Sequence, residues 1–150
     1  MPKKFDEFKL NRQILNAVEE AGFTEATPIQ EKAIAPVLSG QDLFGIAQTG
    51  TGKTAAFAIP VINLLHVRKE YDDLPGIKCL VMVPTHELAI QITEVFASIA
   101  KHTKITTLGI YGGVTINTQK KAVYEGVDIL VGTPGRTMDL ALDAVVRFDE

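Results

Sequence analysis

The chain has 150 residues, 46% of them hydrophobic, and its 15 Lys and Arg against 18 Asp and Glu residues give a formal net charge of -3. This composition suits one folded domain and excludes an intrinsically disordered chain, and the slightly acidic balance argues against purely electrostatic binding of nucleic acid. No apolar run approaches the roughly 18 residues that cross a bilayer, and the single cysteine excludes an internal disulfide, so we expect a cytoplasmic protein without a membrane segment.

Two helices are predicted in the first 40 residues. Residues 10–21 place apolar side chains at helical spacing, between an asparagine that can cap the helix and a glycine that can end it. A second helix should begin at Thr27, because Pro28 suits the first helical position and Gln30 completes a Thr-x-x-Gln capping box. This helix should end by residues 39–40.

Beyond residue 42 the pattern alternates between strand, turn and helix. Apolar runs predict strands at 43–46, 77–83, 105–111 and 127–131. Helices are predicted at 52–67, at about 88–99, at 117–124 and at 136–143. Strands separated by helices imply right-handed crossovers and a parallel sheet covered on both faces. Ligands of such sheets bind beyond the carboxyl ends of the strands. We therefore expect the turns 48–54, 84–87, 112–113 and 133–136 to share one rim.

A glycine-rich octapeptide follows the first predicted strand and fits the P-loop pattern, with alanine in place of the usual first glycine. Its residues are Ala47, Gln48, Thr49, Gly50, Thr51, Gly52, Lys53 and Thr54. The glycines permit backbone conformations that direct successive N–H groups inward, and the following helix points its positive end to the same place. Lys53 should reach the outer phosphates, and the Thr54 hydroxyl should ligate Mg²⁺. An ordinary glycine turn is the alternative, but the position between strand and helix favours nucleotide binding.

Together with four other motifs, this loop resembles the DEAD-box ATP-dependent RNA helicases. In chain order, the motifs are Gly22-Phe23 with Thr27-Pro28-Ile29-Gln30 (Q motif), Ala47 to Thr54 (motif I), Pro84-Thr85-His86-Glu87-Leu88-Ala89 (motif Ia), Gly112-Gly113 with Gln119 downstream (double glycine) and Thr133-Pro134-Gly135-Arg136 (motif Ib). Their order and approximate spacing hold over nearly the whole chain, which makes the combination specific. The resemblance implies a RecA-like P-loop NTPase fold, an α/β class with a parallel β-sheet and helices on both faces.

The resemblance also implies a domain organisation. Residues 1–26 would be an N-terminal flanking segment, and residues 27–150 a partial RecA-like helicase domain, with the second RecA-like domain absent. The family's Asp-Glu-x-Asp motif is not present. Only 12 residues separate Arg136 from Asp149, too few for a helix, a turn and a full strand that would carry the terminal Asp149-Glu150 to the rim. We therefore expect a fragment of a longer helicase whose fold is incomplete at the C-terminus.

For the nucleotide, the resemblance implies ATP and Mg²⁺ as cofactors. It assigns the adenine to Thr27 and Gln30, with Phe5 packing near the base, and the phosphates to residues 47–54. A glutamine amide suits this task, because it offers both a donor and an acceptor to the adenine edge. From the residues alone, helix capping is the favoured explanation of Thr27 and Gln30, whereas the family resemblance favours adenine recognition. Lys53 and Thr54 would carry the catalytic chemistry, with Thr54 as the metal ligand.

For RNA, the resemblance assigns the sugar-phosphate backbone to Pro84, Thr85, His86, Gly112, Gly113, Thr133, Pro134, Gly135 and Arg136. Hydroxyls, glycine N–H groups, helix N-termini and an arginine can hold phosphates without reading bases. Taken alone, residues 133–136 would be a capped helix start with a solvated arginine. His86 stands where the family usually has arginine. Because histidine is mostly neutral at pH 7, the grip on RNA here should be weaker or pH-dependent, unless His86 is simply a surface residue.

The leading interpretation is the N-terminal part of an RNA-dependent ATPase that separates short RNA duplexes in the full-length protein, with RNA and the second RecA-like domain as partners. Without the acidic pair that holds Mg²⁺ and orients water, the isolated chain should hydrolyse ATP hardly at all. One alternative is a nucleotide-binding switch or scaffold without turnover. Another is a different P-loop enzyme, such as a DNA helicase or a small-molecule kinase.

Three other residue types receive no role in the chemistry. His66 and His102 are expected at the surface near helix ends, and Cys79 as a small apolar core residue rather than a reactive thiol. Glu87 should cap the start of its helix rather than touch the nucleotide site across the rim.

Overall fold

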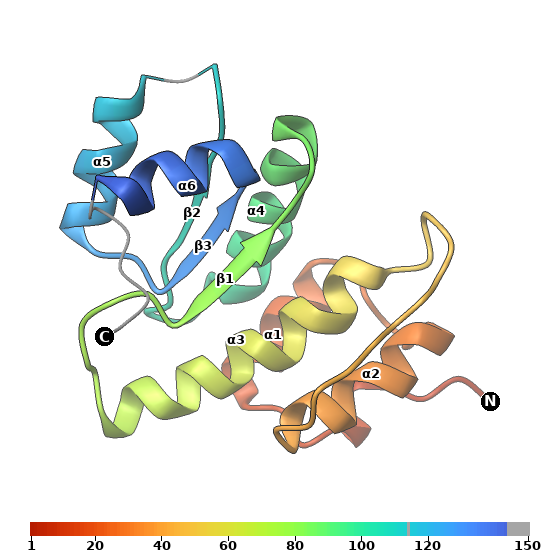
Figure 1. The fold of residues 1–150 in the computed structure, drawn as a ribbon. Helices are drawn as coiled ribbons and strands as arrows, with labels where there is room; N and C mark the ends of the chain where they lie inside the picture. The colour runs from red at the N-terminus through yellow and green to blue at the C-terminus, as the bar shows by residue number, and fades with distance from the viewer. Residues whose placement is uncertain (114, 144–150) are drawn as a thin grey trace. The chain divides into compact units, whose positions relative to one another are not determined.

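The computed structural model describes residues 1–113 and 115–143 (Figure 1). The chain divides into two compact units, the first made of Met1–Asp72 with Val95–Lys104 and the second of Asp73–Glu94 with the described part of Ile105–Glu150. None of the helices in the described ranges is both long and apolar enough to span a membrane.

The first unit is helical. It contains a 3-10 turn η1 (Phe5–Glu7) and the helices α1 (Arg12–Glu20), α2 (Pro28–Leu38) and α3 (Lys53–Tyr71), together with the residues of α4 (His86–Ala100) from Val95 onward. Both predicted N-terminal helices are confirmed. The Asn11 side chain caps α1 by accepting a hydrogen bond from the Gln13 N–H at 3.2 Å, and α2 follows Thr27 with Pro28 in its first turn. Local capping chemistry therefore fixes where these helices start.

The core of the first unit lies along one face of α3. Ile59 and Ile62 are completely buried, and Phe57 packs against Phe96 of α4 with ring centroids 5.8 Å apart. His66 is also buried, at 7% exposure, so the expectation of a surface position was wrong. Helix α3 runs to Tyr71, beyond the predicted end at residue 67. Position 66 is therefore inside the helix, on the same face as Ile59 and Ile62.

His102 lies at the surface, as expected. Its Nε2 is 2.8 Å from Oε1 of Glu20 at the end of α1, and Lys101 Nζ also pairs with that carboxylate. Hydrogen bonds from Lys101 and His102 hold the pKa of the Glu20 carboxyl below its usual value. The end of α4 is thus tied to α1 by charge as well as by packing.

The predicted strand at 43–46 is not formed. Residues 41–48 have no regular secondary structure, and Leu43, Phe44 and Ile46 are 47%, 89% and 83% exposed. A strand needs a neighbour to satisfy its N–H and C=O groups, and no strand pairs with this run among the residues that the structure describes. The apolar run indicated that the segment has strand propensity. Whether it pairs with another strand depends on tertiary contacts.

The other three predicted strands form a parallel sheet in the second unit. Strands β1 (Cys79–Met82), β2 (Thr107–Ile110) and β3 (Ile129–Gly132) lie in the order β1-β3-β2, so the last strand in the chain is the central one. Helices α5 (Ile116–Glu125) and α6 (Pro134–Leu142) follow β2 and β3, within a few residues of their predicted limits. The arrangement confirms the predicted α/β class.

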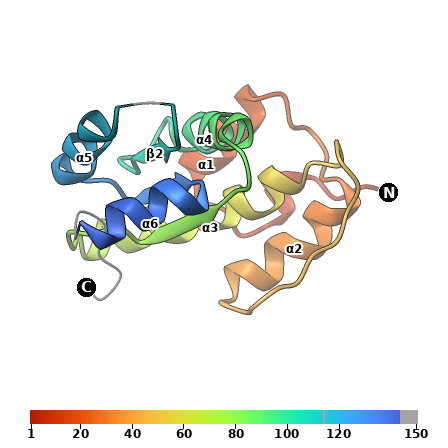
Figure 2. The same ribbon diagram turned by 45° about the horizontal axis from the view of Figure 1, so that its top comes forward.

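Helices cover both faces of this sheet (Figure 1 and Figure 2). On one face, Leu130 of β3 packs in a buried cluster with Val123 of α5 and Leu140 of α6. On the other face α4 approaches closely, since a Cβ added to Gly109 would lie 2.8 Å from Thr93 Oγ1. Successive strand residues point to opposite faces, so even and odd positions of β2 and β3 meet different helices.

Strand β1 is less covered than its sequence suggested. Its burial alternates along the strand, with Leu80 and Met82 38% and 49% exposed. A nearly continuous apolar run had predicted burial on both faces. However, β1 is at one side of the described sheet, whereas the buried cluster of α5 and α6 is centred on β3 and β2. Cys79 is partly buried, and its burial raises the pKa of the thiol, as fits a packed rather than a reactive cysteine.

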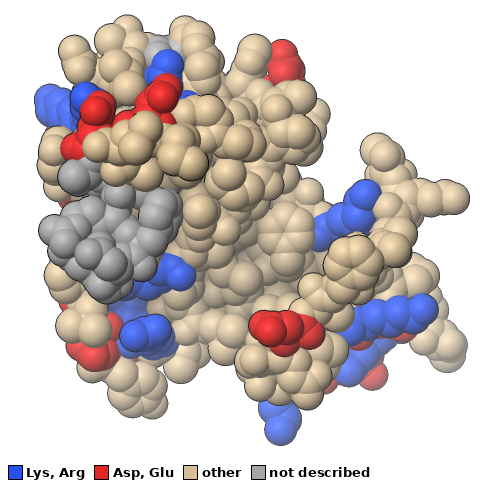
Figure 3. Space-filling model, viewed as in Figure 1, with Lys and Arg blue, Asp and Glu red and all other residues tan. Residues whose placement is uncertain are grey.

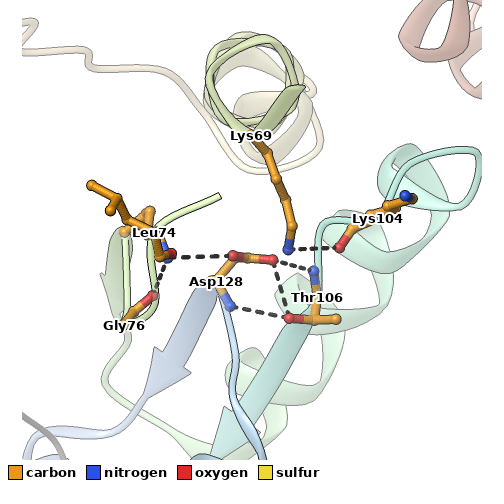
Figure 4. Close-up of polar contacts among 7 residues, drawn as sticks. Lys69, Leu74, Gly76, Lys104, Thr106 and Asp128 are labelled. Carbon is orange, nitrogen blue, oxygen red and sulfur yellow. Dashed lines mark hydrogen bonds and ion pairs between the residues drawn. The ribbon is translucent and has the colours of Figure 1, made fainter. Parts of the chain in front are cut away.

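A polar network joins the amino ends of the three strands (Figure 4). Asp128, directly before β3, is 5% exposed, and its carboxylate accepts hydrogen bonds from the N–H and the hydroxyl of Thr106 at 3.0 and 3.2 Å. Lys78, directly before β1, places its Nζ 3.7 Å from the Asp128 carboxylate. The same ammonium donates to the carbonyls of Leu74 and Gly76. One carboxylate therefore connects the residues that precede all three strands.

We predict that Asp128→Ala lowers the free energy of unfolding by about 2 to 4 kcal/mol, because it removes a buried acceptor from Thr106 and an anion from Lys78. Urea denaturation followed by circular dichroism measures this difference. As a control, Asp139→Ala replaces an exposed aspartate of α6 and should change the stability by less than about 0.5 kcal/mol. Equal stability of Asp128→Ala and the parent chain would contradict this role of the network.

Candidate functional site

The glycine-rich loop leads directly into α3. Gly50 and Gly52 have φ angles of +81° and +82°, which confirms that the loop uses conformations open mainly to glycine. The Thr51 hydroxyl donates to the Gln48 carbonyl at 2.6 Å and closes the turn. Lys53 is the first residue of α3 and is exposed. The loop therefore brings a helix N-terminus and a lysine to the same place.

Gln30 of α2 fixes the last residue of this loop. Its amide is 1% exposed, and its Oε1 accepts the Thr27 N–H at 2.9 Å while its Nε2 donates to the Gly52 carbonyl at 3.2 Å. A Cβ on Gly52 would lie only 2.4 Å from Gln30 Nε2. Gly52 is therefore required by packing as well as by its φ angle. The predicted capping role of Gln30 is confirmed, and the same amide also binds the loop.

The Thr27 hydroxyl stands out as an unsatisfied group. Its Oγ1 is buried and faces the Gln30 N–H in the capping box of α2, but it makes no hydrogen bond of regular geometry among the described residues. It also lies beside the loop, 3.4 Å from where a Cβ of Gly52 would be. A buried hydroxyl without a partner carries a desolvation cost, which a polar group of a ligand can remove.

In the fold, Phe5 lies beside the segment that precedes Thr27. An antiparallel bridge between Lys4 and Glu25 holds it there. The Phe5 ring is 4% exposed and packs against Phe8 and Phe23, with ring centroids 6.2 and 6.3 Å apart. A cavity of about 420 Å³ is lined in part by Phe5 and Phe23. The assignment of Phe5 to a nucleobase stays a prediction.

Three of the four predicted turns lie at the carboxyl edge of the parallel sheet. Residues 84–87 follow β1, residues 112–113 follow β2, and residues 133–136 follow β3. The register pairs both Met82 and Ile110 with Gly132, so the three strands end at the same level. The fourth turn, the glycine-rich loop, follows residues that are not a strand and belongs to the first unit.

Each of these three turns presents backbone N–H groups. The Thr85 hydroxyl accepts the Leu88 N–H at 3.2 Å and thereby caps α4. Thr133 is the N-cap of α6, with Pro134 in the first turn. In the turn that follows β2, Gly113 has a φ angle of +86°. Two helix N-termini and a glycine turn therefore stand along one edge, as phosphate contacts require.

A chain of hydrogen bonds connects two of the turns. Arg136 Nη1 donates to Gln119 Oε1 at 2.8 Å, and Gln119 Nε2 donates to the Tyr111 carbonyl at 3.2 Å. Gln119 is 4% exposed. Neither Gln119 nor Tyr111 was predicted as a site residue. The only feature of the sequence that pointed to Gln119 was its position downstream of the double glycine. The amide of Gln119 holds Arg136 and the end of β2 together.

His86 is at the surface but is not isolated. Its ring stacks on Tyr111, with centroids 5.9 Å apart and an interplanar angle of 29°. Its Nε2 lies 2.9 Å from Oε1 of Glu87, which is in the first turn of α4. The side chains of His86 and Glu87 are 53% and 70% exposed.

The electrostatics of the surface are mixed. On the face in Figure 3, Lys and Arg side chains are interspersed with Asp and Glu rather than gathered into one basic patch. The described residues also contain no group of three or more His, Cys, Asp or Glu that could hold a metal ion. A polyanion bound here must therefore rely largely on amides, hydroxyls and helix N-termini.

Known proteins match nearly the whole chain. A family model for the DEAD/DEAH box helicase family matches residues 27–149. The chain belongs to the DEAD/DEAH box helicases. Among curated members, the DEAD-box ATP-dependent RNA helicase CshA of Bacillus cereus is 46% identical over 135 residues, and the ATP-dependent RNA helicase DHH1 of Meyerozyma guilliermondii is 40% identical over 148 residues. These matches cover 90% and 99% of this chain but 25% and 26% of the two relatives, so the chain spans about a quarter of their length.

Solved structures of this helicase family share the fold. A crystal structure of a DEAD box protein from Methanococcus jannaschii has a TM-score of 0.86 and 37% identity, over 96% of this chain and 38% of that one. A hypothetical ATP-dependent RNA helicase from Sulfolobus tokodaii has a TM-score of 0.80 and 36% identity, over 91% of this chain and 38% of that one. The predicted family and the RecA-like α/β fold are confirmed. The terminal Asp149-Glu150 lies outside the described residues.

We predict that Gln30→Ala lowers the free energy of unfolding by about 1 to 3 kcal/mol, because it leaves the Thr27 N–H and the Gly52 carbonyl without their partners. The matched control is Gln48→Ala, which removes an exposed glutamine side chain in the loop and should be nearly neutral. Thermal and urea unfolding of both variants measure the effect. If the two variants were equally stable, the Gln30 amide would not hold the loop.

Proposed function

We propose that residues 27–150 are a partial RecA-like helicase domain that binds ATP–Mg and the RNA sugar-phosphate backbone, preceded by a flanking segment at 1–26. In the full-length protein it would act with a second RecA-like domain to separate short RNA duplexes. The observation that carries the proposal is the glycine-rich loop at the N-terminus of α3, whose Gly52 is fixed by Gln30. The two curated relatives are ATP-dependent RNA helicases, which supports the same function.

The loop residues fit a triphosphate. Positive φ angles at Gly50 and Gly52 allow a concave run of N–H groups, and the helix N-terminus adds positive potential. Lys53 would contact the outer phosphates from its exposed position, and the half-buried Thr54 would contribute a hydroxyl ligand to the metal. Mg²⁺ held there together with the phosphates would offset the charge that develops during phosphoryl transfer.

The base would lie against the Q motif. The unsatisfied Thr27 hydroxyl supports this placement, because a polar edge of adenine would supply the partner that the buried oxygen lacks. Gln30 would contribute by exchanging one of its two internal hydrogen bonds for one to the base. Phe5, buried beside the same segment, would pack near the ring.

RNA would lie along the carboxyl edge of the sheet. Thr85 and Thr133 stand at two helix N-termini, and Gly113 offers backbone N–H groups at the end of the neighbouring strand β2. Arg136 donates to Gln119, and a guanidinium suits phosphate oxygens because it presents several N–H donors in one plane. Pro84, Gly112, Pro134 and Gly135 complete the assigned backbone contacts, and His86 stands in the same turn as Thr85. Such contacts hold a strand whatever its sequence.

Turnover by the 150-residue chain would be slow. The sequence has no Asp-Glu-x-Asp motif to hold the metal and orient the attacking water. This feature favours a second candidate function for the chain alone, a nucleotide-binding switch or scaffold without turnover.

We predict that Lys53→Ala weakens binding of ATP in the presence of Mg²⁺ by at least about tenfold, since a charge-assisted contact to phosphate is worth about 1.5 to 3 kcal/mol. Isothermal titration calorimetry measures the dissociation constant. Lys32→Ala, which removes an exposed lysine of α2, is the control and should bind normally. Undiminished binding by Lys53→Ala would contradict the phosphate assignment, and equal binding of GTP and ATP by the parent chain would contradict adenine recognition.

For RNA, we predict that Arg136→Met weakens binding of a single-stranded oligonucleotide and reduces the slope of log K against log salt concentration by about 1, as expected for the loss of one phosphate contact. Fluorescence anisotropy over a salt series measures both quantities. Lys32→Met removes one positive charge far along the chain from the three turns and should leave the slope unchanged. An unaltered slope in Arg136→Met would exclude Arg136 from the phosphate contacts.

A further inference from the structure

An aromatic pair connects two of the turns at the carboxyl edge of the sheet. His86 directly follows Thr85 at the start of α4, and Tyr111 directly precedes Gly112 at the end of β2. Their rings are stacked, with centroids 5.9 Å apart and planes 29° from parallel. Contacts to phosphates need donors rather than rings, so the phosphate contacts do not explain why two rings are stacked at this position.

Tyr111 is held in place from several sides. Its carbonyl accepts the hydrogen bond from the buried Gln119, which is itself held by Arg136. Its ring also lies along the strand beside Gly109, where an added Cβ would be 3.4 Å from Tyr111 Cε1. The side chain is half-buried. Tyr111 is therefore held firmly in the fold, and the more exposed His86 ring stacks on it.

Tyr111 also borders a cavity in the same unit. This cavity of about 280 Å³ lies between α4 and β2. Its lining consists of Ile90, Thr93, Glu94, Thr107, Leu108, Gly109 and Tyr111. Space for a planar group is thus available next to the ring pair.

The negative charge of Glu87 beside the ring pair favours an uncharged ligand group. The Glu87 carboxylate lies 2.9 Å from His86 Nε2 and is 70% exposed. A phosphate placed on the imidazole would also approach this carboxylate, and like charges repel at short range. A nucleobase carries no charge and can stack on the ring face while the Glu87 carboxylate orients its edge nitrogen.

We propose that the His86–Tyr111 pair is a stacking platform for one unpaired base of a single-stranded RNA. The proposal rests on the RNA binding proposed above, because the flanking Thr85 and Gly112 hold the backbone on either side of the rings. The base lies on the exposed face of His86, and Tyr111 supports that ring from below. Stacking is tolerant of sequence, and it supplies affinity without positive charge, which suits a chain of net charge -3.

The test measures binding of a short single-stranded RNA to the 150-residue chain over a series of salt concentrations, with ATP and Mg²⁺ present. Tyr111→Leu and His86→Leu should each weaken binding by about 5- to 100-fold, the range for loss of one base–aromatic stack. Tyr111→Phe and His86→Phe keep a ring and should bind like the parent chain. The slope of log K against log salt concentration should stay unchanged in all four variants, because no phosphate contact is lost.

A second measurement changes the RNA instead of the protein and uses Tyr111→Leu only for comparison. RNAs with a single abasic position, placed at each nucleotide in turn, should include one that binds the parent chain more weakly by a similar factor. The same RNA should bind Tyr111→Leu no more weakly than intact RNA does. A 2-aminopurine at that position should change its fluorescence on binding to the parent chain but not to Tyr111→Leu.

The outcomes separate the two proposals. A parent chain that binds no RNA overturns the proposed RNA binding itself. A chain that binds RNA, yet shows unchanged affinity in folded Tyr111→Leu and His86→Leu and for every abasic RNA, overturns the platform alone. If either leucine variant fails to fold by circular dichroism, the abasic series on the parent chain decides.

Discussion

Parallel pairing of β1 and β2 with β3 is the constraint on which the second unit depends. Because both partners end level with Gly132, the turns that follow the three strands meet at one edge. At the opposite ends of the strands, the Asp128 carboxylate connects the residues that precede them. One edge is therefore held by buried charge and hydrogen bonds, which leaves the other edge available for amides, hydroxyls and rings that face a ligand.

In the first unit, a single amide has a comparable role. Gln30 caps its own helix through the Thr27 N–H and holds the glycine-rich loop through the Gly52 carbonyl. Capping and loop support are therefore not competing explanations of this residue, since the two ends of one amide serve both. The arrangement also leaves the neighbouring Thr27 hydroxyl buried without a partner, and a ligand that satisfied it would recover a desolvation cost.

A chain with a small negative charge can bind a polyanion only if its charges and dipoles are well placed. The helix N-termini of α3, α4 and α6 supply positive potential without basic residues. The stacked rings of His86 and Tyr111 add an uncharged contact surface. His86 places a ring, rather than a permanent charge, at the start of α4.

The sequence by itself determined the features that depend on neighbouring residues. Caps at Asn11 and Thr27, positive φ angles at Gly50 and Gly52 and the succession of strands and helices follow from local sterics and hydrogen bonding, and the short motifs identified the family. Features that depend on partners distant in the sequence were decided only by the tertiary structure. The run at 43–46 has strand propensity but no paired neighbour in the described chain, His66 became buried because α3 continues past it, and β1 kept one exposed face. The contact of Gln119 with Arg136 and Tyr111 joins three separate elements, and no local pattern encodes it, because the energy of such a bond depends on a fold that brings the residues together.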